Sequence, residues 1–411
     1  MLIFRLGFRN SLRNIRRSML TASMVVMGVA ALVVAMSWIE GILGDMITSS
    51  TDTIGHVRVA DPDFVKREQL MPMYENIADV APVVEAAAAI PGVTAAYPVI
   101  QTGAAVSAGD EFGDTFGLVV GAPEPYFSET LKLEKYLVEG TWFTGDPNEF
   151  ILGERLAKKA DAEVGKDVLL IGQTQDGAMS PIKGKVVGII HSGTAAFDQR
   201  AFVPLAKAQY LVDIPDGAIE VLAFGADRHA AAGIRDAMKA DPAFTDYEVQ
   251  AWSDREPWNA LAGIIIAMQG ILGGFVVFIV GLGIWVTMMA SVLERTGEIG
   301  VLRAMGLSRV QTVLMFVFEA MLIAAVGGVF GVLLGAGPAY WLEVNGITFG
   351  EDLTQNIGTD MVVRPVVYGD MSPSVAIKGF LLGLAMAIVG SAIPAIRAAL
   401  IQPVEAMRAR R

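Results

Sequence analysis

The chain has 411 residues, of which 53% are hydrophobic and 18% are charged, and its formal net charge is −12 at pH 7. A soluble protein carries about 25% charged residues, so the composition argues against an ordinary soluble protein. The acidic balance argues against nucleic acid as a partner, and the absence of cysteine excludes disulfides.

Long uncharged stretches point to a membrane protein. Four of them contain no Asp, Glu, Lys or Arg: 18–39, 257–293, 320–342 and 379–396. Because a helix needs about 20 apolar residues to cross the hydrocarbon core, we predict four transmembrane helices, at 19–44, 257–293, 312–342 and 376–396. The first has a basic start, as a signal peptide would. Its 22-residue run is longer than the usual apolar core of about 7–15 residues, so we expect a retained helix.

Basic residues near the ends of the spans predict the orientation. The segments 1–17, 294–309 and 397–411 have a net charge of +9 together, which leaves −21 for the rest of the chain. Four spans place these three segments on one side, so we predict that both termini and the 294–309 loop are cytoplasmic. Residues 1–18 alternate apolar residues with arginines, which is typical of an amphipathic helix on the inner membrane surface. The same arginines would also serve simply to set the topology.

The segment between the first two spans predicts a large outer domain. Over 45–255, short runs of β-type residues are separated by Gly, Pro and Asp, and 74–90 and 229–240 read as helices. We therefore expect an α-helical membrane protein with four transmembrane helices and a large α+β extracytoplasmic domain of two lobes. The second span is longer than a membrane requires, which predicts a stalk on the outer side. A smaller outer loop is expected at 343–374.

Patterns of catalytic residues are missing from the sequence. The three histidines are widely separated, and no metal-binding or G-x-S-x-G motif is present. The nearest match to a phosphate-binding loop, at 164–167, lacks the first glycine and ends in Asp. We therefore expect no enzyme activity, no metal site and no cofactor on this chain.

Two features inside the membrane region carry chemical information. Glu319 lies within the third span, where a carboxylate is costly and suggests an ion pair or a coupling role; a position at headgroup level is the alternative. Gly327, Gly331 and Gly335 repeat at the G-x-x-x-G spacing, which favours close helix packing, although glycine is also common in membrane helices.

The charged segment ERTGEIGVLRAMGLSR at 294–309, together with Glu319 and the glycine-rich third span, resembles the FtsX-like (MacB-type) permeases of ABC transporters. The tail 394–408 resembles the end of the same family. The resemblance implies a permease of the mechanotransmission type. It would pair with a second copy or a sibling permease and work with two ATPase subunits, which bind the ATP and Mg²⁺. Residues expected to contact the ATPase are Glu294, Arg295, Glu298, Ile299, Gly300, Arg303, Ala304 and Gly306.

Within the family, the passage 41–59 resembles the lipoprotein-releasing permeases (the LolC/LolE type). This implies an inner-membrane protein that moves lipoproteins or other amphiphilic cargo on the outer side of the membrane, with membrane lipid as a further partner. Two alternatives remain at this point. One is a signalling permease that activates a periplasmic partner, such as a cell-wall hydrolase. The other is an exporter of drugs or peptides with a periplasmic adaptor. A secondary transporter is disfavoured, because no inverted repeat or chain of intramembrane charges is visible.

Overall fold

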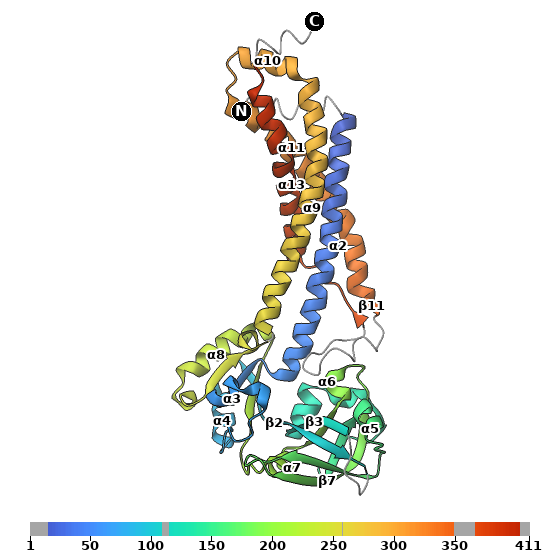
Figure 1. Cartoon of the computed structure of the whole chain (residues 1–411), viewed down its shortest axis with the longest axis vertical. Coiled ribbons are helices and arrows are strands. Elements are labelled where there is room, and N and C mark those ends of the chain that lie inside the picture. Colours follow the sequence, from blue (N-terminus) through green and yellow to red (C-terminus); the bar gives the residue numbers. More distant parts are fainter. Residues whose placement is uncertain (1–14, 109–114, 257, 349–365, 403–411) are drawn as a thin grey trace. The chain divides into compact units, whose positions relative to one another are not determined.

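The computed structural model describes residues 15–108, 115–256, 258–348 and 366–402 (Figure 1). The chain divides into two compact units. Unit 1 comprises Met1–Gly44, Ala262–Ile347 and Val367–Arg411, and unit 2 comprises Asp45–Leu261 and Thr348–Val366. The amphipathic helix expected at 1–18 lies almost wholly outside the described residues, as do most of the outer loop and the end of the tail.

Unit 1 contains long apolar helices. They are α2 (Ile15–Ile54), α9 (Trp258–Glu294), α11 (Arg309–Asn345) and α13 (Pro373–Leu400), with the short α10 (Thr296–Ala304) between α9 and α11. Residues 45–54 of α2 and 258–261 of α9 belong to unit 2. In the described part of the chain, four helices are long and apolar enough to cross a membrane. Each of the four continues beyond the predicted span at one or both ends. The predicted limits followed the charged residues, and a helix can carry charged residues where it leaves the hydrocarbon core.

Glycines let α11 approach α2 closely. A Cβ atom at Gly331 would lie 2.7 Å from Cβ of Val29 and 2.9 Å from the carbonyl oxygen of Val26. Gly327 and Gly335 meet α2 backbone oxygens at 3.1 and 2.8 Å in the same way. The G-x-x-x-G positions of the third span therefore form the contact with the first helix, where a larger side chain would force the helices apart.

The ends of α10 and α11 explain the turn between them. Gly306 has φ +101° and follows the last turn of α10, a left-handed conformation that favours glycine after a helix. The side chain of Ser308 accepts a hydrogen bond from the Gln311 N–H, and the Gln311 side chain accepts one from Ser308. This capping box begins α11. The segment 294–309, for which the family resemblance implies a coupling helix or loop between two spans, is thus a helix followed by a tight turn.

Unit 2 is built on a continuous set of paired strands. They are β1 (Val57–Ala60), β2 (Val93–Ser107), β3 (Thr115–Ala122), β4 (Leu137–Gly140), β5 (Glu149–Gly153), β6 (Asp167–Gln173), β7 (Met179–Ile190), β8 (Arg200–Pro204), β9 (Glu220–Gly225) and β10 (Glu248–Ala251). Their order is β10-β1-β9-β2-β3-β8-β5-β7-β4, and β6 pairs with both β2 and β7. Strands β2, β3, β8, β5, β7 and β6 therefore close into a ring, and β10, β1 and β9 continue from β2 as a sheet.

The long strand β2 joins these two parts. The sequence shows two short β-type runs here, 94–100 and 103–108, but the structure joins them in one strand. The first half of β2 pairs with β9 through Val99, and the second half pairs with β3 from Ile100 onward. Pro98 has no N–H to donate to the strand pairing, and it directly precedes Val99, the last residue of β2 that pairs with β9.

Short helices cover unit 2. They are α3 (Pro62–Lys66), α4 (Ala81–Ala89), α5 (Glu154–Lys159), α6 (Ala195–Asp198), α7 (Leu205–Val212) and α8 (Ala231–Ala240). The helix expected over 74–90 begins only at Ala81, because Pro82 favours the first turn and Ile77 instead pairs with Ala218. Side chains of α4 and α8 enter the same hydrophobic core as β1, β9 and β10. A second, aromatic-rich core includes residues of β2, β3, β8 and β9.

Candidate functional site

The helix α10 has one face buried in unit 1 and one face exposed. Ile299 is 2% exposed and Gly300 is also buried, so they hold α10 against the bundle. Val301 and Met305 are 43% and 72% exposed. Glu298, Val301 and Met305 are three and four residues apart, which places them on one side of the helix. This side mixes one acid with two apolar residues.

Arg295 connects the start of α10 to α11. It lies between α9 and α10, and its Nη1 is 3.5 Å from Oε1 of Glu319. Both side chains are buried, at 7% and 6% exposed. Glu319 lies ten residues into α11, which corresponds to about 15 Å along the helix. The carboxylate that the sequence placed in the third span is therefore an ion-pair partner of the segment that precedes that span.

Arg303 connects the last turn of α10 to the end of α13. Its Nη1 donates a hydrogen bond to the main-chain carbonyl of Ile401, the residue that follows α13. A helix ends with carbonyl groups that have no partner within the helix, and a cation near them is favourable. Through Arg295 and Arg303, α10 is attached to two long helices besides α9, from which it continues in the chain.

The eight residues expected to contact an ATPase fall into two groups. Arg295, Ile299 and Gly300 are buried, and Arg303 is partly buried. They attach α10 to its own unit and have little surface to offer a partner. The exposed members are Glu294, Glu298, Ala304 and Gly306. The sequence did not single out Val301 and Met305. Apolar residues are common throughout this chain, so only the structure shows that these two are exposed.

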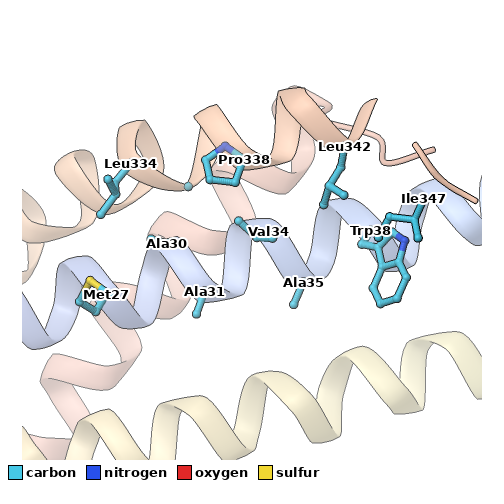
Figure 2. Close-up of a pocket in the computed structure, with 11 residues that line it drawn as sticks. Met27, Ala30, Ala31, Val34, Ala35, Trp38, Leu334, Pro338, Leu342 and Ile347 are labelled. Atoms are coloured by element: carbon cyan, nitrogen blue, oxygen red, sulfur yellow. The ribbon is translucent and has the colours of Figure 1, made fainter. Parts of the chain in front are cut away.

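An apolar groove lies between α2 and α11 (Figure 2). Its volume is about 580 Å³. The lining residues are Met27, Ala30, Ala31, Val34, Ala35, Trp38, Leu334, Gly335, Pro338, Leu342 and Ile347. Figure 2 shows that small side chains line the α2 wall and that Trp38 lies at one end. This chemistry suits hydrocarbon better than a polar ligand.

Unit 2 holds a cluster of buried charges that sequence reasoning missed. Arg58 in the middle of β1 is 1% exposed. It donates to both carboxylate oxygens of Glu68, from Nη1 at 2.6 Å and from Nη2 at 3.0 Å. Its Nη2 also donates to the Gln250 side chain at 2.7 Å, and Nη1 lies 3.7 Å from Oε2 of Glu220. A buried arginine held in this bidentate way is strongly oriented.

A second arginine joins this cluster to the end of α2. Arg255 Nη1 donates to the carbonyl of Ile54 at 2.9 Å, and its Nη2 lies 3.3 Å from Oε1 of Glu68. The Tyr126 hydroxyl donates to the carbonyl of Thr53 at 2.7 Å. The last carbonyls of α2 are thus satisfied by side chains from distant parts of unit 2. Gly55, with φ +82°, ends the helix.

The pKa values of the two glutamates of the cluster are shifted in opposite directions. Burial raises the pKa of Glu220, and the charges of Arg255 and Arg58 offset this only in part. Burial also acts to raise the pKa of Glu68, but the hydrogen bonds and charges of Arg58 and Arg255 outweigh it and leave that pKa lowered. Glu68 is therefore the firmly ionised partner of the arginine pair.

A cavity of about 1090 Å³ opens beside this cluster. Its charged lining includes Arg58, Arg200, Arg255, Glu68 and Glu220, and its apolar lining includes Phe64, Val99, Val120, Tyr126, Leu131, Phe202, Leu222 and Trp258. The cavity therefore joins a charged side to an apolar side.

Three carboxylates of unit 2 also converge, those of Asp61, Asp63 and Glu75. Asp61 accepts hydrogen bonds from the N–H groups of Asp63 and Phe64 and so caps α3. Glu75 accepts a hydrogen bond from Arg67 at 2.8 Å. These contacts account for the group as a helix cap with a surface ion pair, and we assign it no metal.

Family models match both parts of the chain. Residues 18–239 match the MacB-like periplasmic core domain, and residues 270–403 match the FtsX-like permease C-terminal domain. The chain therefore belongs to the FtsX-like, MacB-type family of ABC transporter permeases. The resemblance of the sequence to FtsX-like (MacB-type) permeases is confirmed, as is a fold of membrane helices with a large α/β domain. Membership of this permease family implies an ATPase partner.

Individual relatives match over parts of their length. A macrolide export ATP-binding/permease protein MacB from Nitrobacter winogradskyi is 28% identical over 292 residues, which are 66% of this chain and 41% of that protein. The ABC transporter permease YvrN of Bacillus subtilis is 31% identical over 126 residues, 31% of this chain and 26% of that protein. The chain thus spans less than half the length of these relatives. The periplasmic region of MacB from Actinobacillus actinomycetemcomitans, a solved structure, is 13% identical with a TM-score of 0.37, covering 53% of this chain and 97% of that one.

Proposed function

We propose that this chain is the permease of a mechanotransmission ABC transporter, which uses ATP hydrolysis by its ATPase partner to move lipoprotein or other amphiphilic cargo. The cargo would move on the outer side of the inner membrane. The observation that carries the proposal is the attachment of α10. This helix continues from α9, and Arg295 and Arg303 link it to α11 and to the end of α13. A displacement of α10 would therefore act on three long helices together.

The exposed side of α10 supplies the contact with the ATPase. Glu298, Val301 and Met305 are exposed there, and a mixed acidic and apolar surface of this kind fits a groove on a protein partner. ATP and Mg²⁺ would bind to the ATPase partner, and this chain would carry no catalytic residues. Nucleotide states that differ in their contact energy with α10 are sufficient to drive the change.

The basic segments favour a cytoplasmic position for α10. The charge difference between 1–17, 294–309 and 397–411 and the rest of the chain supports this orientation, which puts unit 2 in the periplasm. A second permease copy or a sibling permease would complete the transporter, with two ATPase subunits.

A charge reversal on α10 tests the proposal. In the chain reconstituted in lipid with its ATPase, Glu298→Lys should leave ATPase binding measurable but abolish the dependence of cargo release on ATP. Glu343→Lys makes the same change of charge at an exposed position of α11 in the same unit and should behave as the unchanged protein. If Glu298→Lys releases lipoprotein at the normal rate per ATP hydrolysed, α10 is not the coupling element.

A second cargo class is favoured by the relatives. The Nitrobacter winogradskyi protein and several others are named for macrolide export, so export of drug-like amphiphiles is the second candidate. Stimulation of ATP hydrolysis separates the two. A lipoprotein should stimulate the reconstituted complex if extraction is the function, whereas a macrolide should do so if export is.

A further inference from the structure

The cavity in unit 2 has the dimensions and the divided lining of a ligand site. Its volume of about 1090 Å³ is slightly larger than that of typical ligand pockets, which measure about 300–1,000 Å³. All its lining residues lie between Thr53 and Asn259, within unit 2. The cavity is therefore a feature of this unit alone.

The charged side of the cavity has more basic than acidic side chains. The basic lining residues are Arg58, Lys66, Arg67, Arg200 and Arg255, of which Arg58, Arg200 and Arg255 are buried or largely buried. The acidic lining residues are Glu68, Glu220, Asp254 and Glu256. Burial favours the neutral form of Glu220. The site is thus best matched by an additional negative charge.

Glu68 occupies the place that such a charge would take. Its two oxygens accept hydrogen bonds from Arg58, and one of them also lies 3.3 Å from Arg255. The arginines are held by the sheet and by the end of α2, but Glu68 belongs to a helix of only three residues, η1 (Glu68–Leu70). Its side chain is 43% exposed, against 1% for Arg58. The carboxylate can therefore leave more easily than the arginines can.

Removing Glu68 requires a substitute anion. A buried arginine that loses its charged partner is strongly destabilising, so a neutral ligand would not displace the carboxylate. A carboxylate or phosphate group offers the same paired oxygens for bidentate hydrogen bonds.

The apolar side of the cavity fits a hydrocarbon chain. Tyr126 and Phe202 are 2% and 1% exposed, and Leu131 is 8% exposed. At the rim, on the segment that carries Glu68, Leu70 and Met71 are 77% and 37% exposed. Exposed apolar residues beside an opening are typical of a site that admits an apolar ligand.

We propose that this cavity binds an anionic amphiphile, with its carboxylate or phosphate headgroup on Arg58 and Arg255 in place of Glu68. Its hydrocarbon chain lies against the aromatic wall formed by Tyr126 and Phe202. The proposal rests on the proposed function for the amphiphilic nature of the cargo, and it adds the charge of the headgroup and the place of binding. Glu68 acts as an internal competitor that holds the arginines until a ligand arrives.

Equilibrium binding to the full chain in detergent, without the ATPase, tests this site. Radiolabelled palmitate is the probe, with methyl palmitate, phosphatidylglycerol and inorganic phosphate as competitors. Palmitate or phosphatidylglycerol should compete, and the tighter of the two identifies the headgroup. Equal competition by methyl palmitate would show that no anion is recognised, and equal competition by inorganic phosphate would show that no chain is recognised. Either result overturns the proposal.

Two substitutions with opposite expected effects on affinity distinguish a binding site from a purely structural cluster. Arg255→Gln should weaken palmitate binding by about tenfold or more, and Glu68→Gln should tighten it because the internal competitor is neutralised. A purely structural cluster would make both variants bind more weakly, which would contradict the site. Lys183→Gln and Glu163→Gln change exposed members of other ion pairs in this unit and should leave binding unchanged. Because no ATPase is present, failure here leaves the role of α10 untouched, and failure of the Glu298 test leaves this site untouched.

Discussion

Arg295 and Glu319 form an ion pair in unit 1, with Nη1 and Oε1 3.5 Å apart and both side chains less than a tenth exposed. The pair joins the residue before α10 to the first third of α11. The sequence left Glu319 open between a headgroup-level position and a structural ion pair. Its burial against Arg295 favours the ion pair, and it makes this contact part of the attachment of α10.

Glu319→Gln should destabilise unit 1. The change removes the carboxylate charge that faces Arg295 in a buried site, and breaking such a pair costs about 3–5 kcal/mol. Thermal unfolding of the full chain in detergent measures the effect. Glu343→Gln, at an exposed position of the same helix, is the control. The double variant Arg295→Met with Glu319→Leu should recover much of the stability, since it removes both charges. Equal melting temperatures for Glu319→Gln and the control would mean that the pair contributes nothing.

Arg303→Gln should reduce coupling more than stability. It loses the charged hydrogen bond to the Ile401 carbonyl, worth about 1.5–3 kcal/mol, and so frees α10 from the end of α13. In the reconstituted complex, ATP hydrolysis should continue while cargo release per ATP falls. Arg397→Gln changes an exposed arginine in the last turn of α13 and should leave the ratio unchanged. A normal ratio for Arg303→Gln would show that α13 does not receive the motion of α10.

Gly331→Ala should separate α2 from α11. The added Cβ would lie 2.7 Å from Cβ of Val29 and 2.9 Å from the Val26 carbonyl, closer than real contacts allow, and such overpacking costs about 1–3 kcal/mol. Gly337→Ala in the same helix meets nothing within 4 Å and is the matched control. Thermal unfolding should show a lower midpoint for Gly331→Ala only. If the two alanine variants melt together, the close approach of these helices does not matter for stability.

The membrane helices could be predicted from the sequence because their signal is local. A run without charge, such as 257–293, identifies a span wherever the rest of the chain lies. The coupling segment was harder. Its position between two spans could be read directly, but the buried and exposed sides of α10 depend on where Arg295 and Arg303 find partners. Those partners, Glu319 and Ile401 among them, lie far along the chain or in another helix.

The cluster in unit 2 could not be predicted for a related reason. In the strand that contains Arg58, the neighbouring residues Val57 and Val59 point to the opposite face, so the pattern suggests that Arg58 faces water. The structure covers that face with the segment carrying Glu68, and with Arg255 from near the start of α9. Only the tertiary fold brings these three residues together, and no local spacing announces it. A positive residue in an apolar strand was the sole signal in the sequence.

The stability of unit 2 should depend on pH through the ionisation of Glu220. Burial raises its folded-state pKa above the ordinary value of 4.5. A raised pKa contributes stability that is complete below 4.5 and is lost as the pH rises through the folded-state value. The lowered pKa of Glu68 acts in the other direction, and its contribution is lost only as the pH falls below 4.5. Of these two groups, only Glu220 therefore changes the stability of unit 2 as the pH rises above 4.5. There the free energy of unfolding of unit 2 should fall with rising pH, by at most about 1.4 kcal/mol per pH unit.

Glu220→Gln should flatten this slope, because glutamine does not titrate. Amide hydrogen exchange of β1 and β9 in the full chain, corrected for the intrinsic pH dependence of exchange, measures it. Glu139→Gln, at an exposed position of β4, should keep the slope of the unchanged protein. A slope that survives in Glu220→Gln would assign the pH dependence to another group, and it would remove the support that the raised pKa of Glu220 gives to the anion site at Arg58 and Arg255.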